Sequence, residues 1–176
     1  MSQKKLILIV VGVLVVLGLV LVFRTPIRKA WRRGHARHEP SKGMLKNPEA
    51  IAFDTDGTVY VGNQDSSDIA VLNPDGSFRS KFDRVEGYVG GDGAPVNISR
   101  GLYMQNAGPG RLILTAVHNV AELDVSGSTP KLVRIIGKKG SAPGEMDGPE
   151  GLSRDVNGDI YVTDEHNRRL NVFKAD

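Results

Sequence analysis

The sequence predicts an all-β fold, a partial β-propeller, preceded by one apolar transmembrane α-helix. Three observations support this prediction: one stretch occurs twice, short β-type segments alternate with turn residues, and an uncharged apolar run lies near the N-terminus. The chain has 176 residues and no cysteine, so a disulfide framework is excluded. Thiolate metal sites are excluded as well.

The repeat relates Pro48–Val61 to Pro149–Val162, which lies 101 residues further along the chain, without a gap. A weaker copy between them contains Gly101–Met104 and Gly110–Leu114. The units therefore recur about every 50 residues, a period typical of propellers and stacked arrays. In such folds each unit buries its apolar face against its neighbours.

Each unit contains segments with β-strand character. Asp56-Gly57 and Asn157-Gly158 predict two-residue hairpin turns between the first two segments, because both central residues of such a turn need positive φ. The third segment of each unit is Ile69–Leu72, Val120–Leu123 or Leu170–Phe173. The fourth segment is Phe78–Phe82 in the first unit and Leu132–Ile136 in the middle unit. Four antiparallel strands per period make one propeller blade.

Residues 48–176 thus hold about 2.6 blades, fewer than the four that a closed ring typically needs. Open sheet edges and uncovered faces favour pairing with other chains. The favoured expectation is that the chain is part of a longer protein. The alternative is that this chain is complete and forms a homo-oligomer, in which two or three copies build the ring.

The last unit resembles an NHL repeat in Gly137–Glu145, Pro149–Leu152, Asp155–Asp164 and Asn167–Phe173. Gly91–Pro95 is similar to the glycine-rich link that often leads into such a unit. The resemblance extends over residues 48–176 and implies a β-propeller of four-stranded blades. It also implies a binding platform with a protein or other ligand as partner, because NHL-like propellers mostly serve that purpose.

An enzyme is the alternative that the resemblance leaves open. Related propellers include peptidyl-hydroxyglycine lyases and lactonases, which are metal-dependent, so a lyase or hydrolase would have its remaining site residues outside this chain. The lyases carry a zinc-binding histidine where this chain has Arg169. No catalytic residue is identified from the sequence. Arg168 and Arg169 are expected to pair with acidic residues of a neighbouring blade.

Three residues at matching positions are candidates for a ligand-binding face: Asp65, His118 and His166. Each falls in the loop after the second strand of its unit, and in propellers these loops share a face with the links between blades. Imidazole and carboxylate groups are also ligands for divalent metals. His118 and His166 are therefore candidate metal ligands, and no other cofactor is expected.

Leu6–Phe23 is a run of 18 residues without a charge, about 27 Å long as a helix, which suffices to span a bilayer core. Basic residues instead of a small-residue cleavage site follow it, which indicates an uncleaved anchor. Residues 1–5 would then be a tail and residues 24–47 a basic juxtamembrane linker. In this single-pass arrangement the charge bias favours a cytosolic propeller, whereas the NHL resemblance favours an extracytoplasmic one.

The net charge changes sign along the chain. Residues 1–46 carry a net charge of +9 and residues 47–176 a net charge of −6. Arg28, Lys29, Arg32 and Arg33 lie close after the apolar run and suit anionic lipid head groups, at about 1 kcal/mol per residue; a solvated linker is the alternative. The acidic β-domain disfavours general nucleic-acid binding, which depends on neutralising phosphates.

Overall fold

The computed structural model describes residues 41–89, 95–98 and 103–175. Within this part every regular element is a β-strand, and it holds no helix long and apolar enough to cross a membrane. The predicted helix Leu6–Phe23 and the four basic residues proposed to meet lipid lie outside the described residues. The predicted anchor therefore stays a prediction.

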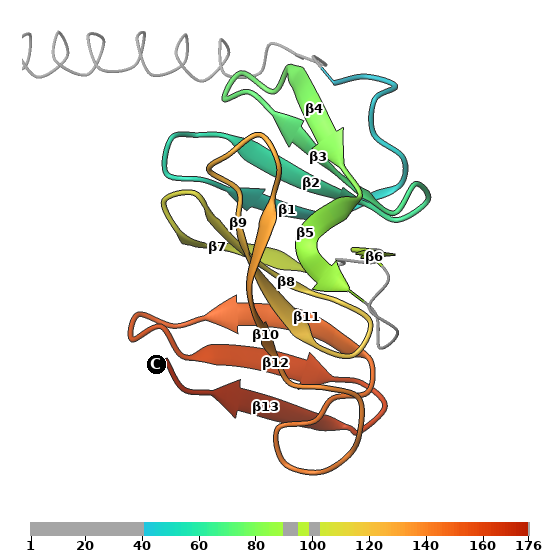
Figure 1. Cartoon of the computed structure of the whole chain (residues 1–176), viewed down its shortest axis with the longest axis vertical. Coiled ribbons are helices and arrows are strands. Elements are labelled where there is room, and N and C mark those ends of the chain that lie inside the picture. Colours follow the sequence, from blue (N-terminus) through green and yellow to red (C-terminus); the bar gives the residue numbers. More distant parts are fainter. Residues whose placement is uncertain (1–40, 90–94, 99–102, 176) are drawn as a thin grey trace, which may run out of the picture. The chain divides into compact units, whose positions relative to one another are not determined.

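The described strands form three sheets, which we call the first, middle and last sheets (Figure 1). The first sheet contains β1 (Pro48–Phe53), β2 (Val59–Asn63), β3 (Asp68–Leu72) and β4 (Phe78–Phe82). The middle sheet contains β5 (Arg84–Val89), β6 (Pro95–Asn97), β7 (Met104–Gly108), β8 (Arg111–Thr115), β9 (Val120–Asp124) and β10 (Lys131–Ile136). The last sheet contains β11 (Pro149–Arg154), β12 (Ile160–Asp164) and β13 (Arg169–Phe173).

Successive strands of each unit pair antiparallel, as the blade prediction requires. The middle sheet differs because it has six strands, in the order β6-β5-β10-β9-β8-β7. Its two additional strands join along β10, where Lys131 pairs with Glu86 in parallel and the Glu86 N–H donates to the Pro130 carbonyl at 2.9 Å. The strand β10 would otherwise present an unpaired outer edge.

The hairpin turns are longer than predicted. The Asp54 N–H donates to the Thr58 carbonyl at 2.8 Å, and the Gly57 N–H donates to the Asp54 carbonyl at 3.0 Å. Gly57 has a φ of 86°, whereas Asp56 is not among the residues with positive φ. The loop is thus a three-residue turn with one left-handed glycine, which fits strand twist as well as a two-residue turn does. The same two bonds recur in Asn73–Ser77 and Asp155–Asp159.

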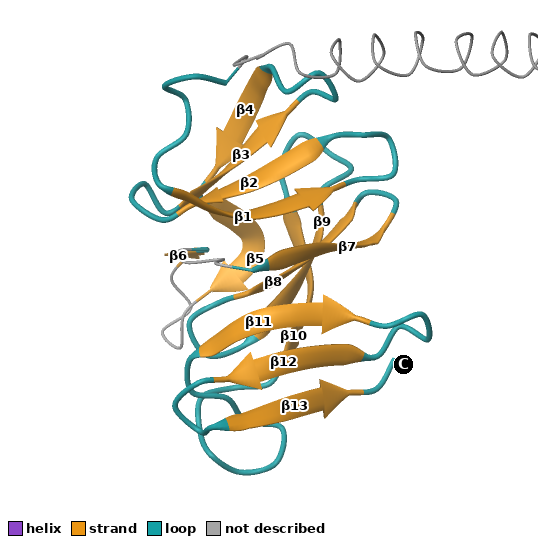
Figure 2. Ribbon diagram, turned by 180° about the vertical axis from the view of Figure 1, so that it is seen from behind, coloured by secondary structure: helices purple, strands orange, loops and turns teal. Residues whose placement is uncertain are grey.

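The sheets pack face to face through two apolar clusters. Between the first and middle sheets lie Tyr60, Ile69 and Val71 on one side and Leu112, Leu114 and Leu123 on the other. Between the middle and last sheets lie Ile113 and Val120 on one side and Met146, Ile160 and Val162 on the other. The strand β7 contacts both β1 and β11, so the strands that begin the three repeat units are neighbours (Figure 2). This arrangement is that of successive propeller-type blades.

Candidate functional site: the loop face

In both copies of the repeat, the same three hydrogen bonds join the loop after the second strand to the link before the first strand. In the last unit the Asp147 N–H donates to Asp164 Oδ1 at 2.8 Å. The Glu165 N–H donates to the Gly148 carbonyl at 3.0 Å, and the His166 N–H to the Asp147 carbonyl at 3.1 Å. The same three bonds occur in the first unit. The Lys46 N–H donates to Asn63 Oδ1. The Gln64 N–H donates to the Asn47 carbonyl, and the Asp65 N–H donates to the Lys46 carbonyl.

These bonds make the repeat structural as well as sequential. Asn47 and Gly148, which are 101 residues apart, both have a left-handed backbone, with φ of 50° and 75°. Glycine adopts that conformation freely, and asparagine tolerates it better than most residues. The link and the loop therefore form one rigid surface, which we call the loop face. It contains residues 46–47 and 64–65 in the first unit and residues 147–148 and 164–166 in the last unit.

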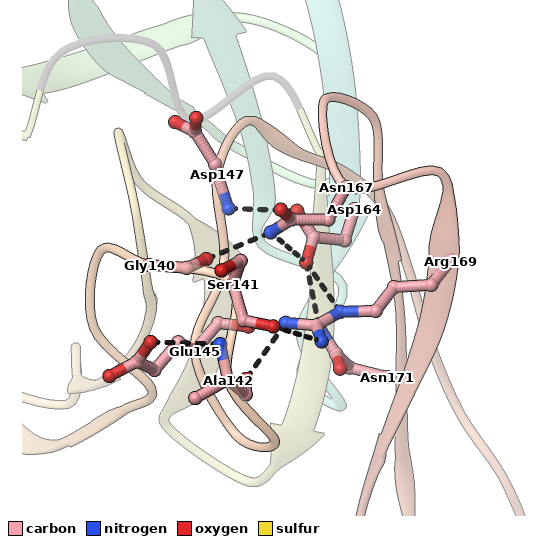
Figure 3. A network of polar contacts seen from close by, with 9 residues as sticks. All are labelled: Gly140, Ser141, Ala142, Glu145, Asp147, Asp164, Asn167, Arg169 and Asn171. Carbon is pink, nitrogen blue, oxygen red and sulfur yellow. Dashed lines mark hydrogen bonds and ion pairs between the residues drawn. The ribbon is translucent and has the colours of Figure 1, made fainter.

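Asp164 is the centre of the polar network behind the loop face of the last unit (Figure 3). Its Oδ2 atom accepts hydrogen bonds from Asn167 at 2.9 Å, from Arg169 at 3.1 Å and from Asn171 at 3.1 Å. Burial by itself would raise the pKa of Asp164, but the bonds from Asn167, the Asp147 backbone and Arg169 lower that pKa below its ordinary value. The carboxylate therefore remains charged inside the sheet.

Arg169 uses the rest of its guanidinium group to hold the segment between β10 and β11, residues 137–148, which we call the glycine-rich link. Its Nη1 donates to the Ser141 carbonyl at 2.7 Å, and its Nη2 donates to the carbonyls of Ala142 and Glu145 at 2.9 and 2.6 Å. The predicted pairing of this arginine with an acid of a neighbouring blade is wrong, because its ion-pair partner Asp164 lies in the same sheet.

Two of the three predicted loop residues, His118 and His166, come together around Asp147, which was not predicted from the sequence. His118 lies between β8 and β9, and His166 lies between β12 and β13. The Nδ1 atoms of both face Oδ1 of Asp147, at 3.3 Å for His118 and 3.7 Å for His166. The side chain of His118 is 30% exposed, that of His166 is 62% exposed and that of Asp147 is 37% exposed. The cluster therefore joins the middle unit to the last one at the surface.

The cluster has unused hydrogen-bonding capacity. The Nδ1 atom of His118 is shielded from solvent and has no hydrogen bond of acceptable geometry, although Asp147 is near. His166 also faces Glu165, with Nε2 at 3.7 Å from its carboxylate. Gly148 leaves room for the His166 ring, since a Cβ atom there would lie 3.1 Å from Nδ1. Within the cluster the His118 Nδ1 atom is thus a buried polar atom that no hydrogen bond satisfies.

Asp65 is not part of this cluster. It lies in the loop between β2 and β3 of the first sheet, and its carboxylate accepts a hydrogen bond from Asn47 at 3.3 Å. Sequence reasoning missed Asp147 because it considered only the loops after second strands. The expectation that links share a face with these loops was the signal that would have led to Asp147.

The described residues do not make a complete metal site. Among residues 41–89, 95–98 and 103–175, no group of three or more His, Cys, Asp or Glu side chains is placed to hold a metal ion. Two imidazoles beside one carboxylate are suitable ligand types, but a resident metal would need ligands from elsewhere.

Residues 146–173 match the family model of the NHL repeat. The chain is thus similar to the NHL repeat over this segment. This segment extends from the buried Met146 to the end of β13, so it contains Asp147, the Asp164 network and His166. The resemblance deduced for the last unit is thereby confirmed.

No curated protein matches the chain. Among solved structures, one described as "Streptogramin B lyase structure" is similar to it, with 19% sequence identity and a TM-score of 0.46. The match covers 75% of this chain and 39% of that one. The chain thus spans well under half the length of that protein.

Proposed function

We propose that the β-domain is an interaction platform that binds its partner through the loop face around His118, Asp147 and His166. The observation that carries this proposal is the convergence of two partly exposed imidazoles on one carboxylate, from three separate segments. Rigid placement lowers the entropic cost of binding, and the backbone bonds of the NHL repeat supply that rigidity here. A protein partner is the proposed occupant.

We further propose that the platform is tethered to a membrane by Leu6–Phe23, with Arg28, Lys29, Arg32 and Arg33 against anionic head groups. This proposal is supported by the length and apolarity of Leu6–Phe23 and by the positive charge of the four basic residues. The net charge of −6 on residues 47–176 keeps the β-domain itself away from an anionic surface. The tether would then leave the loop face available to a partner.

Photo-crosslinking tests the loop face with a matched pair of positions. Val117 is 53% exposed in the loop that carries His118, and Val156 is 102% exposed in the turn between β11 and β12 at the opposite end of the last sheet. A photoreactive residue replaces each valine in the full chain within its native cells. The proposal expects a defined protein adduct from position 117 that falls several-fold in a His118→Ala, His166→Ala background. Equal adducts from both positions, or none from either, would contradict it.

A metal-dependent lyase or hydrolase is the second candidate, and the paired imidazoles are the observation that favours it. Titration of the full chain with Zn²⁺, followed by the NMR signals of the two rings, separates the candidates. The enzyme hypothesis expects both rings to shift at stoichiometric metal, and loss of the shift in His118→Ala. If neither ring signal shifts with the metal while the loop-face adduct forms, a role of His118 and His166 as metal ligands within this chain is contradicted, and the platform remains the proposal.

A further inference from the structure

The two copies of the repeat hold the loop face with the same backbone bonds but present different side chains on it. The positions that differ are Lys46, Gln64 and Asp65 in the first unit, and Asp147, Glu165 and His166 in the last unit, 101 residues further along the chain. The first unit forms the same three bonds with its own residues. The side chains that the last unit presents are therefore not needed to hold its backbone.

In the first unit, one amide side chain joins the two exposed loop residues. The Nδ2 atom of Asn47 donates to Gln64 Oε1 at 2.7 Å and to Asp65 Oδ1 at 3.3 Å. The residue 101 positions later is Gly148, which has no side chain and supplies neither bond. The last unit therefore lacks the N–H donor that the first unit places between the corresponding two residues.

The carboxylates of Asp147 and Glu165 are accessible and have no donor in the part of the chain that the structure describes. Their side chains are 37% and 59% exposed. The His166 ring faces both of them, with Nδ1 at 3.7 Å from Asp147 and Nε2 at 3.7 Å from Glu165, too far for hydrogen bonds. The His118 Nδ1 atom near Asp147 also makes no hydrogen bond. Among the described residues, no lysine or arginine forms an ion pair with either carboxylate.

We propose that the partner of the loop face places a basic side chain, arginine or lysine, against Asp147 and Glu165, beside the His166 ring. This inference rests on the proposed interaction platform and adds the chemistry of its partner. The N–H groups of the partner take the role that the Asn47 amide has in the first unit. A cation suits this place better than an amide, because the acceptors are charged and hydrogen bonds between ionised groups are about twice as strong as neutral ones.

Small amides test this chemistry directly on the full chain. N-acetyl-arginine amide and N-acetyl-lysine amide are titrated while the NMR signals of the His166 ring are followed, with N-acetyl-citrulline amide as the uncharged analogue. We expect a saturable shift with a cationic amide and a response at least several-fold weaker with citrulline. The shift should be lost in Glu165→Gln, which copies Gln64 of the first unit and so preserves the backbone bonds. Equal shifts with citrulline, or no shift with any amide, would overturn the proposal.

Photo-crosslinking from position 117 separates this inference from the proposed platform. We expect Glu165→Gln and Asp147→Asn each to lower the protein adduct several-fold. Asp83→Asn is the matched control, since it removes one negative charge from an exposed residue between β4 and β5, and it should leave the adduct unchanged. An adduct that depends on the two histidines but not on the two carboxylates would keep the platform and overturn the basic side chain. Absence of any adduct would contradict the platform, and the amide titration would still decide whether the site binds a basic group.

Discussion

Asp164 has a fully buried carboxylate that accepts four hydrogen bonds within the last unit. In an Asp164→Asn variant Arg169 keeps its charge but loses its ion-pair partner. We expect a loss of about 3 kcal/mol in the free energy of unfolding at pH 7, measured by urea denaturation. Asn63→Ala is the matched control, since Asn63 has the same place in the first unit but is uncharged, and it should cost less.

The ionisation of Asp164 should also make the free energy of unfolding depend on pH. The pKa of Asp164 lies below its ordinary value of 3.8 in the folded state, so folding favours the ionised form. Its stabilisation is fully present above the ordinary pKa and is lost as the pH falls through the lowered folded pKa. The stability difference between wild type and Asp164→Asn should therefore shrink below about pH 4. A difference that is the same at pH 3 and pH 7 would contradict this assignment.

Gly148 tests how closely the loop face is built around His166. In Gly148→Ala a side chain must accept a φ of 75°, and its Cβ would press on the His166 ring at 3.1 Å. Gly144→Ala is the control, because its φ is 80° with nothing within 4 Å. The left-handed backbone costs about 1 to 2 kcal/mol at either position. We expect a larger loss of stability, and a shift of the His166 NMR signals, only in Gly148→Ala.

At the scale of elements, the glycine-rich link is held by an apolar side chain as well as by Arg169. Met146 is completely buried between the middle and last sheets, whereas its repeat counterpart Leu45 only partly covers the first sheet. Met146→Ala should therefore cost about 3 kcal/mol of unfolding free energy, and Leu45→Ala clearly less. Equal costs in thermal or urea denaturation would contradict this difference between the two units.

At the scale of the whole molecule, the proposed tether predicts how the protein partitions. The full chain should remain with membranes after alkaline carbonate washing and should dissolve in detergent, because an apolar span of 18 residues is held by the bilayer core. Deletion of residues 1–23 should release it. A chain that carbonate extracts would contradict the tether, and a reporter enzyme fused at the C-terminus would identify the side of the β-domain.

The elements that the sequence predicted correctly are those that depend on local pattern. Alternating apolar residues and the left-handed glycines Gly57 and Gly158 recur with the repeat, so the strands of the first and last units could be read directly. The first strand of the middle unit was misplaced, because β7 is Met104–Gly108 and not Gly101–Met104. The NHL character of the last unit was equally visible, because its signature residues are contiguous. The size of the turns was missed, since Asp-Gly suits both turn types and the choice depends on the strand register around it.

The sequence by itself determined an all-β repeat with an NHL unit at its end, because strand periodicity and turn chemistry act over a few residues. The tertiary structure alone decided which distant groups meet. It placed β5 along the free edge of β10, joined His118 and His166 through Asp147, and left Leu170 and Val172 exposed while their counterparts Ile69 and Val71 are buried. These outcomes depend on which edges and faces remain unpaired after the sheets pack, and no local pattern contains that information.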